Sequence, residues 1–420
     1  MSPATIDRLC EALRRRPAEL AAARAAGTPV VGYFCCNVPE ELVLAAGLVP
    51  VRLGSGGDER LVELGGRYIS HQNCPFVRQN VGVFARAAGE AEGVDDSEEG
   101  ARSGVGALRS AWAEHVDTVL VAATCPQIYR LGEVIESFFG RRVEILGVPR
   151  NFTSDEGRAY FRAEVAALAD RLGAIGGQPV TPERLTTTVD LLARTRTAIR
   201  RLYDLQAAHP EVLSWRTVFE TVHAGFVLDR GEYADLLEDL LAEATALAAE
   251  PVAELDDRIR LFLAGSVISP GDTKILDLVE ELGARIVGDD LCTGLRPARQ
   301  LVVKEPTLDA LADAYLDRVP CAALPHLTLT GDRRLANIEA SYREAGAEGV
   351  IYHSLRYCDP ITFKANETKQ VLGNQIPFLE IHTEYASSDT EGIRTRIDAF
   401  LEMIETAYPP KEWTDAAHNA

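Results

Sequence analysis

The chain has 420 residues, of which 46% are hydrophobic and 25% are charged. This length predicts about two or three domains with substantial apolar cores. The 43 basic and 63 acidic residues give a formal net charge of −20. That balance argues against sequence-independent binding to nucleic acid or to anionic membrane surfaces, because both rely on clustered Lys and Arg.

The first part of the chain alternates between helices and short apolar strands. An amphipathic helical stretch (4–26) precedes an apolar run (29–36) whose Val, Tyr and Phe content predicts a buried strand. Pro39 and two acidic residues then open a helix that ends near Gly47, since proline suits the first turn and acids suit the positive end of the helix dipole. Further strands are expected at 48–53, 117–123 and 143–150.

An acidic stretch rich in Gly and Ser (89–106) interrupts this alternation and predicts a solvated loop or a mobile insertion. From about 155 to 250, long runs of Ala, Leu, Arg and Glu with helical periodicity predict a helical segment. The alternation then returns. Strands are expected at 258–266, 284–290, 349–355 and 377–385, and helices at 272–282, 306–316, 364–373 and 391–406.

Strand–helix–strand units of this kind build parallel sheets covered by helices. The sequence therefore predicts an α/β protein with two doubly wound, Rossmann- or flavodoxin-like lobes and a helical segment between them. The expected division is an N-terminal helical segment (1–28), a first α/β lobe (29–154), a mainly helical segment (155–255) and a second α/β lobe (256–420). In such folds, ligands bind where loops leave the carboxyl ends of the strands.

The sequence shows no sign of a membrane or secretory segment. No stretch approaches the roughly 18 consecutive apolar residues of a spanning helix, and the N-terminus lacks a basic-then-apolar signal pattern. We therefore expect a cytoplasmic protein. Its eight cysteines are too few for a disulfide scaffold, so they are buried thiols, metal ligands or catalytic groups.

Three cysteines, Cys74, Cys125 and Cys358, share one local context. Each follows an apolar stretch and precedes a proline directly or after one residue. Two or three of them lie at expected strand ends, where a thiolate is well placed to bind metal. The alternative for each is a small buried hydrophobe, the usual state of a free cysteine. Their wide separation in sequence matches no compact zinc or ferredoxin motif.

The remaining cysteines have no assigned chemistry. Cys35 and Cys36 end the first expected strand, Cys292 follows a strand within GDDLCTGLR, and Cys321 follows a proline. Their roles stay open. Cys10 lies on the first helix and is expected to be structural.

Several segments together resemble one family. They are GYFCCNVPEELVLAAGLVPVRL (32–53), NCPFVR (73–78), DTVLVAATCPQIYRL (117–131), the segment that contains DDLCTG (258–296) and the C-terminal region (349–404). They resemble the 2-hydroxyacyl-CoA dehydratase component D family, which also includes the catalytic subunits of ATP-dependent benzoyl-CoA reductase. The resemblance runs in order along nearly the whole chain and is weak in the acidic stretch and the helical middle.

This resemblance implies an oxygen-sensitive iron–sulfur protein in which three cysteine thiolates hold a 4Fe–4S cluster between the lobes. The matching positions are Cys74, Cys125 and Cys358. Three thiolates leave one iron open to act as a Lewis acid and electron source. The implied partners are an acyl-CoA substrate, a related second subunit or a second copy of the chain, and an ATP-hydrolysing iron–sulfur activator. Neither nucleic acid nor a membrane is expected as a partner.

The sequence departs from the family's patterns in ways that bear on the cluster. Pro126 follows the middle cysteine, where family members often have Asp. The stretch 108–117 lacks the extra cysteine of a double-cubane branch, and Asp359 follows Cys358 where that branch favours His. We therefore expect a single cubane.

Two classes of function fit these features. The first is a catalytic subunit of an acyl-CoA radical enzyme, which either dehydrates a 2-hydroxyacyl-CoA or reduces benzoyl-CoA or another aromatic acyl-CoA. The second is a non-catalytic, cluster-binding partner or electron-storage subunit of the same family. Neighbouring genes for a second D-component and an activator ATPase would favour the first class.

Five charged residues are candidates for the substrate site. Glu40 or Glu41, just after the first strand, is expected to act as a carboxylate base, although both also suit the helix dipole there. Arg78, Arg130 and Arg296 follow cysteine-bearing loops and are expected to hold CoA, since a guanidinium grips phosphate oxygens in a fixed fork. The alternative for each arginine is an ion pair with a surface acid.

Overall fold

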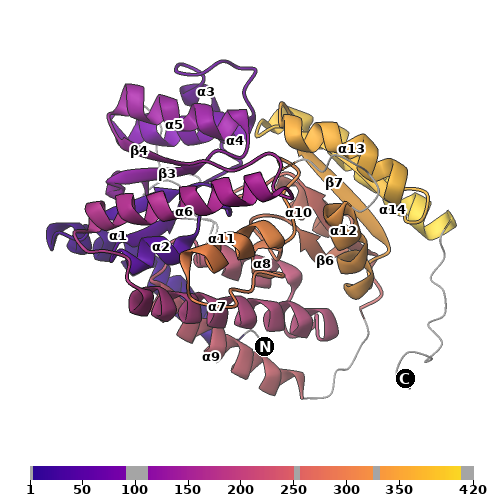
Figure 1. Ribbon diagram of the computed structural model, residues 1–420. Coiled ribbons are helices and arrows are strands. Elements are labelled where there is room, and N and C mark those ends of the chain that lie inside the picture. The colour runs from indigo at the N-terminus through magenta and orange to yellow at the C-terminus, as the bar shows by residue number, and fades with distance from the viewer. Residues whose placement is uncertain (1–2, 91–111, 250–255, 325–331, 408–420) are drawn as a thin grey trace.

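The computed structural model describes residues 3–90, 112–249, 256–324 and 332–407 (Figure 1). Within these ranges it contains two four-stranded parallel sheets, with strand orders β2-β1-β3-β4 and β6-β5-β7-β8. This confirms the predicted α/β class with two doubly wound lobes. The predicted acidic loop (89–106) lies outside the described residues from position 91 onward.

The first sheet consists of β1 (Val30–Tyr33), β2 (Val49–Arg52), β3 (Thr118–Ala122) and β4 (Arg142–Leu146). The central strands β1 and β3 are buried at every position, as expected where helices cover both faces of a parallel sheet. Pro50, which has no N–H to donate, lies in the edge strand β2. All four strands were predicted, and each is shorter than its predicted range because the apolar runs continue into adjoining loops.

The second sheet consists of β5 (Arg260–Gly265), β6 (Arg285–Asp290), β7 (Gly349–Leu355) and β8 (Phe378–Thr383). Its strand order repeats that of the first sheet. In each sheet the first strand lies between the second and third, so the chain changes its winding direction there. The loops that follow β1 and β3, and those that follow β5 and β7, therefore leave topological switch points, where doubly wound folds bind ligands.

Helices pack against both sheets. The first lobe carries α2 (Glu40–Ala45), α3 (Glu59–Gly65), α4 (Pro75–Ala87) and α5 (Pro126–Phe139). The second part of the chain carries α10 (Lys274–Glu281), α11 (Leu308–Asp317), α12 (Arg333–Glu344), α13 (Asp359–Leu372) and α14 (Thr390–Ala407). Short 3-10 turns occur at η2 (Ala113–His115), η3 (Arg296–Ala298) and η4 (Ser387–Asp389).

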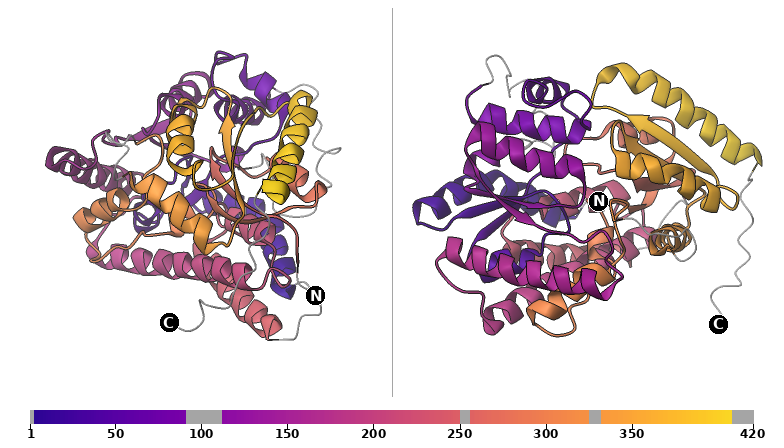
Figure 2. Two further views of the ribbon diagram at one scale, coloured as in Figure 1. Left: turned by 90° about the vertical axis from the view of Figure 1, so that its right-hand side faces the viewer. Right: turned by 45° about the horizontal axis from the view of Figure 1, so that its top comes forward.

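Four further helices connect the two lobes: α6 (Asp155–Gly176), α7 (Pro182–Ala208), α8 (Trp215–Ala224) and α9 (Arg230–Ala248). The helix α1 (Ala4–Ala25) precedes the first lobe and packs against α9. α7 packs against α2 and α9, α8 against β6, and α6 against α11. In Figure 1, α7 and α9 run below both lobes. Both views of Figure 2 place the yellow helix α14 on the outer side of the second lobe. The helical segment predicted from about 155 to 250 thus connects the first lobe to the second.

Local sequence signals set the ends of these helices. Ser154, Thr181 and Ser214 each accept a hydrogen bond from a backbone N–H in the first turn of α6, α7 and α8. Gly177 ends α6 in the left-handed conformation, at φ 69°, which glycine adopts without steric cost.

One hydrophobic cluster extends through both lobes. It includes Val119 and Val121 of β3 together with Leu261 and Leu263 of β5. Because the lobes share this core, the loops at their facing strand ends are held in a fixed relation. No helix in the described ranges is both long enough and apolar enough to cross a membrane.

Candidate functional site

Seven of the eight cysteines line one cavity of about 140 Å³ between the two lobes. We call it the cysteine cavity. Its walls include the loops that follow β1, β3, β5 and β6, together with the end of β7. Its cysteines are Cys35, Cys36, Cys74, Cys125, Cys292, Cys321 and Cys358. The structure therefore brings together the three predicted metal ligands, and it adds four thiols whose roles the sequence left open.

Each predicted ligand lies at the N-terminus of a helix. Cys74, Cys125 and Cys358 are the N-cap residues of α4, α5 and α13, and a proline occupies the first or second helical position after each. Proline fits there because its missing N–H would have no partner in the helix. The positive end of the helix dipole also favours a thiolate over a thiol. The predicted strand ends precede Cys125 and Cys358, whereas Cys74 follows α3 and a turn.

Burial is the main influence on these thiols. It raises the pKa of Cys74 well above the usual thiol value, and the neighbouring Cys358 raises that pKa further. Burial also raises the pKa of Cys125 and brings the pKa of Cys358 to about 12. The three groups are thus close enough to influence one another, and without a metal they are protonated at neutral pH.

The donor set differs from one that would hold a single metal ion. In the part of the chain that the structure describes, no three His, Cys, Asp or Glu side chains converge closely enough to hold one ion. Thiolates around a cubane bind different irons and surround a larger group. The arrangement of the cysteine cavity is therefore unlike a mononuclear site such as structural zinc.

Much of the cavity wall is apolar. Phe34, Phe76 and Phe226 contribute aromatic rings, and the rings of Phe34 and Phe76 meet edge to face at 6.4 Å. Of the aromatic residues close to the predicted ligands in sequence, Phe76 lines the cavity. Tyr129 and Tyr357 instead lie exposed at the surface. Apolar walls limit the entry of water, and so they strengthen electrostatic interactions inside the cavity.

Cys35, Cys36 and Cys292 form a second group within the cysteine cavity. The backbone N–H and the side-chain amide of Asn37 both donate to the Cys35 sulfur at 3.4 Å. Arg318 Nη2 donates to Cys36 Sγ at 3.6 Å. Hydrogen bonds from Cys292 and Cys35, aided by nearby Arg318, hold the pKa of Cys36 well below the usual thiol value. Cys36 is thus the most acidic thiol of this group.

The segment DDLCTG holds Cys292 in place. Asp289, at the end of β6, accepts hydrogen bonds from the backbone N–H groups of Leu291 and Leu295 at 3.0 Å. Its other oxygen accepts bonds from the Tyr203 hydroxyl at 2.7 Å and from the Trp215 indole at 3.0 Å. A Cβ atom at Gly294 would lie 2.1 Å from Asp289 Oδ1, so only glycine fits there. The motif therefore fixes the loop rather than supplying a reactive acid.

We expect Cys36 to be the fastest of the cavity thiols to react with iodoacetamide in cluster-free protein. Its lowered pKa favours the thiolate form, whereas burial raises the pKa of the reference thiol Cys10. As the pH falls below neutral, alkylation of an ordinary thiol slows about tenfold per unit, because its thiolate fraction falls by that factor. The Cys36 rate should fall less steeply over the same range, because its pKa is lower.

Peptide mapping by mass spectrometry measures both rates in one sample. Arg318→Met removes the guanidinium beside the sulfur and should slow the reaction of Cys36 without changing that of Cys10. If the Cys36 and Cys10 rates fall in parallel as the pH is lowered, then Cys36 is not a thiolate.

The two candidate bases have different surroundings. Glu41 is fully buried, and it accepts bonds from Arg196 Nη1 at 2.8 Å and from the Tyr315 hydroxyl at 2.9 Å. Glu40 accepts a bond from the Tyr33 hydroxyl at 2.8 Å and pairs with Arg230. Of the two carboxylates, Glu40 lines a neighbouring cavity of about 120 Å³.

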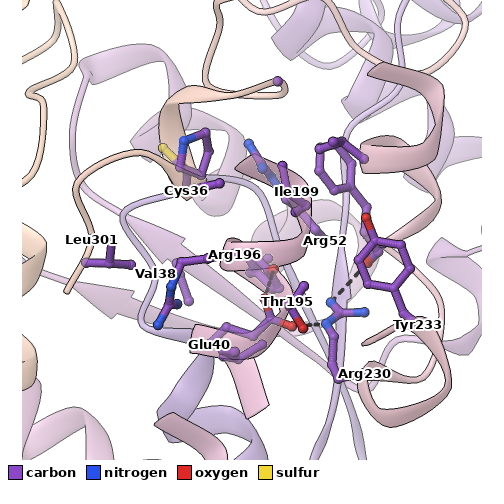
Figure 3. Close-up of a pocket in the computed structure, with 18 of the residues that line it drawn as sticks. Cys36, Val38, Glu40, Arg52, Thr195, Arg196, Ile199, Arg230, Tyr233 and Leu301 are labelled. Carbon is purple, nitrogen blue, oxygen red and sulfur yellow. Dashed lines mark hydrogen bonds and ion pairs between the residues drawn. The ribbon is translucent and has the colours of Figure 1, made fainter. Parts of the chain in front are cut away.

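We call this neighbouring cavity the arginine pocket (Figure 3). Four arginines contribute to its wall, and the figure shows the ion pair between Glu40 and Arg230. Cys36 and Phe226 line both this pocket and the cysteine cavity, so the two spaces share a wall. The arginines of the pocket are Arg52, Arg196, Arg230 and Arg318. None of these four was predicted from the sequence.

The three arginines expected to hold CoA are dispersed. Arg296 lines the cysteine cavity, and its guanidinium binds Asp290 through Nε at 3.0 Å and Nη2 at 2.8 Å. Arg78 is buried but is not among the residues that line the cysteine cavity, and its Nε donates to the Asn73 carbonyl at 3.1 Å. Arg130 is exposed on α5 and pairs with Glu133 one turn later. The expected ring of three arginines around one cavity is thus not formed by these side chains.

Fold and site together define a class: a two-lobed α/β protein whose two switch points share a cysteine-lined cavity. Residues 35–404 match the model of the 2-hydroxyglutaryl-CoA dehydratase D-component family. The chain belongs to this family, which confirms the resemblance found in the sequence. The match includes all seven cysteines of the cysteine cavity.

Individual relatives cover almost the entire chain. A putative dehydratase subunit, YjiM, of Escherichia coli K12 is 27% identical over 412 residues, which cover 96% of this chain and 98% of the relative. A benzoyl-CoA reductase subunit of Thauera aromatica is 25% identical over 415 residues, covering 96% and 99%. The (R)-phenyllactyl-CoA dehydratase beta subunit of Clostridium sporogenes is 22% identical over 382 residues, covering 90% and 92%. The relatives thus include subunits of both dehydratases and a reductase.

Proposed function

We propose that the chain is the iron–sulfur catalytic subunit of an acyl-CoA radical enzyme that receives low-potential electrons from an ATP-dependent activator. Its reaction is the dehydration of a 2-hydroxyacyl-CoA or the reduction of benzoyl-CoA or another aromatic acyl-CoA. The observation that carries this proposal is the cysteine cavity at the switch points of both lobes, in a chain of this family. Relatives named as dehydratase and benzoyl-CoA reductase subunits support both reactions.

The residues present fit a 4Fe–4S cluster held by Cys74, Cys125 and Cys358. Each thiol lies at a helix N-terminus that favours its anionic form, and each would release its proton on binding iron. When bound, the cluster supplies an electron and an open iron that acts as a Lewis acid. The apolar wall, including Phe34 and Phe76, keeps water away from the cavity.

Glu40 is the carboxylate that we propose moves a substrate proton. It lines the arginine pocket beside the cysteine cavity, whereas Glu41 is enclosed by Arg196 and Tyr315. The Tyr33 hydroxyl and Arg230 hold Glu40 in a fixed orientation as a hydrogen-bond acceptor. Glu41 supports the start of α2 and positions Arg196.

We expect Glu40→Gln to lower kcat about 10²–10⁴-fold, the usual contribution of a general base, and to leave KM and cluster content nearly unchanged. The amide keeps the size of the side chain but accepts no proton. Glu41→Gln is the comparison variant, and its main effect should be on stability because it leaves Arg196 buried beside a neutral group. Turnover and iron content are measured on the same anaerobic samples. Wild-type kcat in Glu40→Gln would remove Glu40 from the reaction.

We propose separate roles for the three arginines that were predicted to hold CoA. Arg130 lies at the surface in a weak ion pair that a phosphate can replace. Arg296 faces the interior of the cavity and is oriented by Asp290, so it is placed toward the acyl end of the substrate. Arg78 lies beside the Cys74 loop and supports that loop through the Asn73 carbonyl.

A partner subunit is part of this proposal, because two relatives are named as beta subunits of dehydratases. We propose a dimer with a related second subunit, or with a second copy of the chain, and transient docking of the activator. Three large aromatic side chains are exposed on or beside the helices that begin at Cys125 and Cys358, and they offer apolar area for such a contact. They are Tyr129, Tyr357 and Phe363, of which Phe363 is 73% exposed.

The proposal is tested by anaerobic co-purification with candidate partner subunits and an activator, followed by iron and sulfide analysis. Dehydration should need only catalytic amounts of electrons, whereas aromatic reduction should consume electrons in proportion to product. A chain that holds the cluster but supports neither reaction would be the non-catalytic, electron-storing subunit. Absence of iron and sulfide in anaerobically prepared protein would overturn the assignment.

A further inference from the structure

The arginine pocket has chemistry that a proton-transferring Glu40 does not account for. It lies between α7, α9 and the loops after β1 and β6, and it is separate from the cysteine cavity except for a shared wall that includes Cys36, Arg52 and Phe226. A molecule bound in the pocket would therefore lie beside the cysteine cavity.

Arg196 carries an unused binding group in this pocket. Its Nη1 donates to Glu41, while its Nε and Nη2 are buried and have no hydrogen-bond partner among the described residues. The residue is only 9% exposed. Nε and Nη2 are the two donors on one edge of a guanidinium, which match the two oxygens of a carboxylate or phosphate. Leaving such donors buried and unpaired is unfavourable, so the geometry favours a bound oxyanion.

The charge of the pocket also favours an anion. Among the described residues of its wall, four arginines face a single carboxylate, that of Glu40. Glu41 behind the wall and the sulfur of Cys36 beside Arg318 compensate at most two more positive charges. At least one positive charge is therefore left without a counterion, in a protein whose formal net charge is −20.

The size and apolar part of the pocket limit the ligand. A cavity of about 120 Å³ has room for a few atoms beyond one carboxylate or phosphate, and not for CoA. Leu192, Ile199 and Leu301 line it, so an attached short hydrocarbon chain would contact apolar side chains.

We propose that the arginine pocket binds the oxyanion of a small molecule, a carboxylate or phosphate, through Nε and Nη2 of Arg196. Two sources share this chemistry. One is a free small anion, and the other is a carboxylate at the far end of an acyl chain whose thioester lies toward the cysteine cavity. The second source rests on the proposed function, whereas the first does not.

Calorimetric titration of the anaerobic protein with acetate and with inorganic phosphate tests the site, with chloride replacing each anion to keep the ionic strength constant. Wild-type protein should show saturable binding of at least one anion. Arg196→Lys keeps a positive charge beside Glu41 but loses the two-donor edge, and it should bind at least tenfold more weakly. Arg201→Gln, an exposed position on the same helix, is the matched control and should bind like wild type.

The two sources are separated by comparing succinyl-CoA with butyryl-CoA, which have equal chain length and differ in the terminal carboxylate. Tighter binding of succinyl-CoA that disappears in Arg196→Lys assigns the pocket to an acyl carboxylate. Saturable acetate or phosphate binding without that preference assigns it to a free anion. None of these measurements uses turnover, so failure of this site and failure of the proposed function give different results.

A second variant tests the site independently, in case Arg196→Lys does not fold. Leu192→Phe fills space one turn before Arg196 without removing a charge, and it should also weaken binding. Thermal unfolding without ligand shows whether each variant is folded. Equal affinities in wild type, Arg196→Lys and Leu192→Phe would overturn the site. So would wild-type protein that binds neither anion in excess of chloride and shows no preference for succinyl-CoA over butyryl-CoA.

Discussion

Replacing Cys74, Cys125 or Cys358 with serine is expected to remove the iron–sulfur cluster and abolish activity. Removing a residue that merely hydrogen-bonds to a metal ligand commonly lowers metal affinity roughly 10–100-fold. Removing a ligand itself should cost at least as much, so each single variant should retain less than about a tenth of the wild-type iron and sulfide. The physical reason is that the three thiols line one buried cavity at three helix N-termini. Anaerobic iron and sulfide analysis, together with visible absorption spectra, measures the loss.

The other cysteines provide the controls. Cys10→Ser on α1 lies away from the cavity and should leave iron content unchanged. Cys321 is the sharper comparison, because it lines the same cavity and lies close enough to raise the pKa of Cys125 and Cys358. If Cys321→Ser loses the cluster while one of the three predicted positions tolerates serine, then Cys321 and not that residue is the ligand.

Asp289→Ala should cause a large loss of stability. The Asp289 carboxylate accepts bonds from Tyr203, Trp215 and two backbone N–H groups, all in a buried site. We expect the free energy of unfolding to fall by about 3–5 kcal/mol. Each buried donor left unsatisfied costs roughly 1–3 kcal/mol, and water that enters the vacated space satisfies some of these donors. Urea unfolding of wild type and variant measures the difference.

Two comparison variants define the cause. Asp289→Asn keeps the size of the side chain and one acceptor oxygen, so it should cost less than alanine. Asp170→Ala, at an exposed position of α6, should change stability little. Because Asp289 anchors the loop that carries Cys292, its loss should also slow iodoacetamide modification of Cys36, which depends on a hydrogen bond from Cys292. Normal stability and normal Cys36 reactivity in Asp289→Ala would show that the loop does not depend on this carboxylate.

The fold could be predicted because its signals are local. Short apolar runs between amphipathic helices identified the strands of both lobes, and two central strands, β3 and β7, are buried throughout as such runs require. The Cys-Pro pairs at Cys74 and Cys125 stand at the same positions where the structure begins helices. Both signals depend on residues close in sequence, so one sequence was enough to read them.

Which residues meet in the site depends on contacts between separate elements, and sequence periodicity does not encode those contacts. The Glu40 and Glu41 pair was found as a helix start, but its partners Arg230 and Arg196 come from α9 and α7. No local feature distinguishes Arg196 from the other arginines of α7. Arg52 alone carried a local signal that was overlooked: it ends a largely buried strand, where a charged side chain needs a partner.

Sequence patterns alone were sufficient to predict the two-lobed α/β architecture, the family and the three cysteines expected to bind metal. Three properties of the site became visible only when the elements were packed together: four further cysteines share the cavity, Arg296 is bound to Asp290, and Arg196 keeps two donors without a partner among the described residues. The reason is physical. Hydrophobic periodicity reports which face of an element is buried, whereas the pairing of buried charges depends on how separate elements pack against one another.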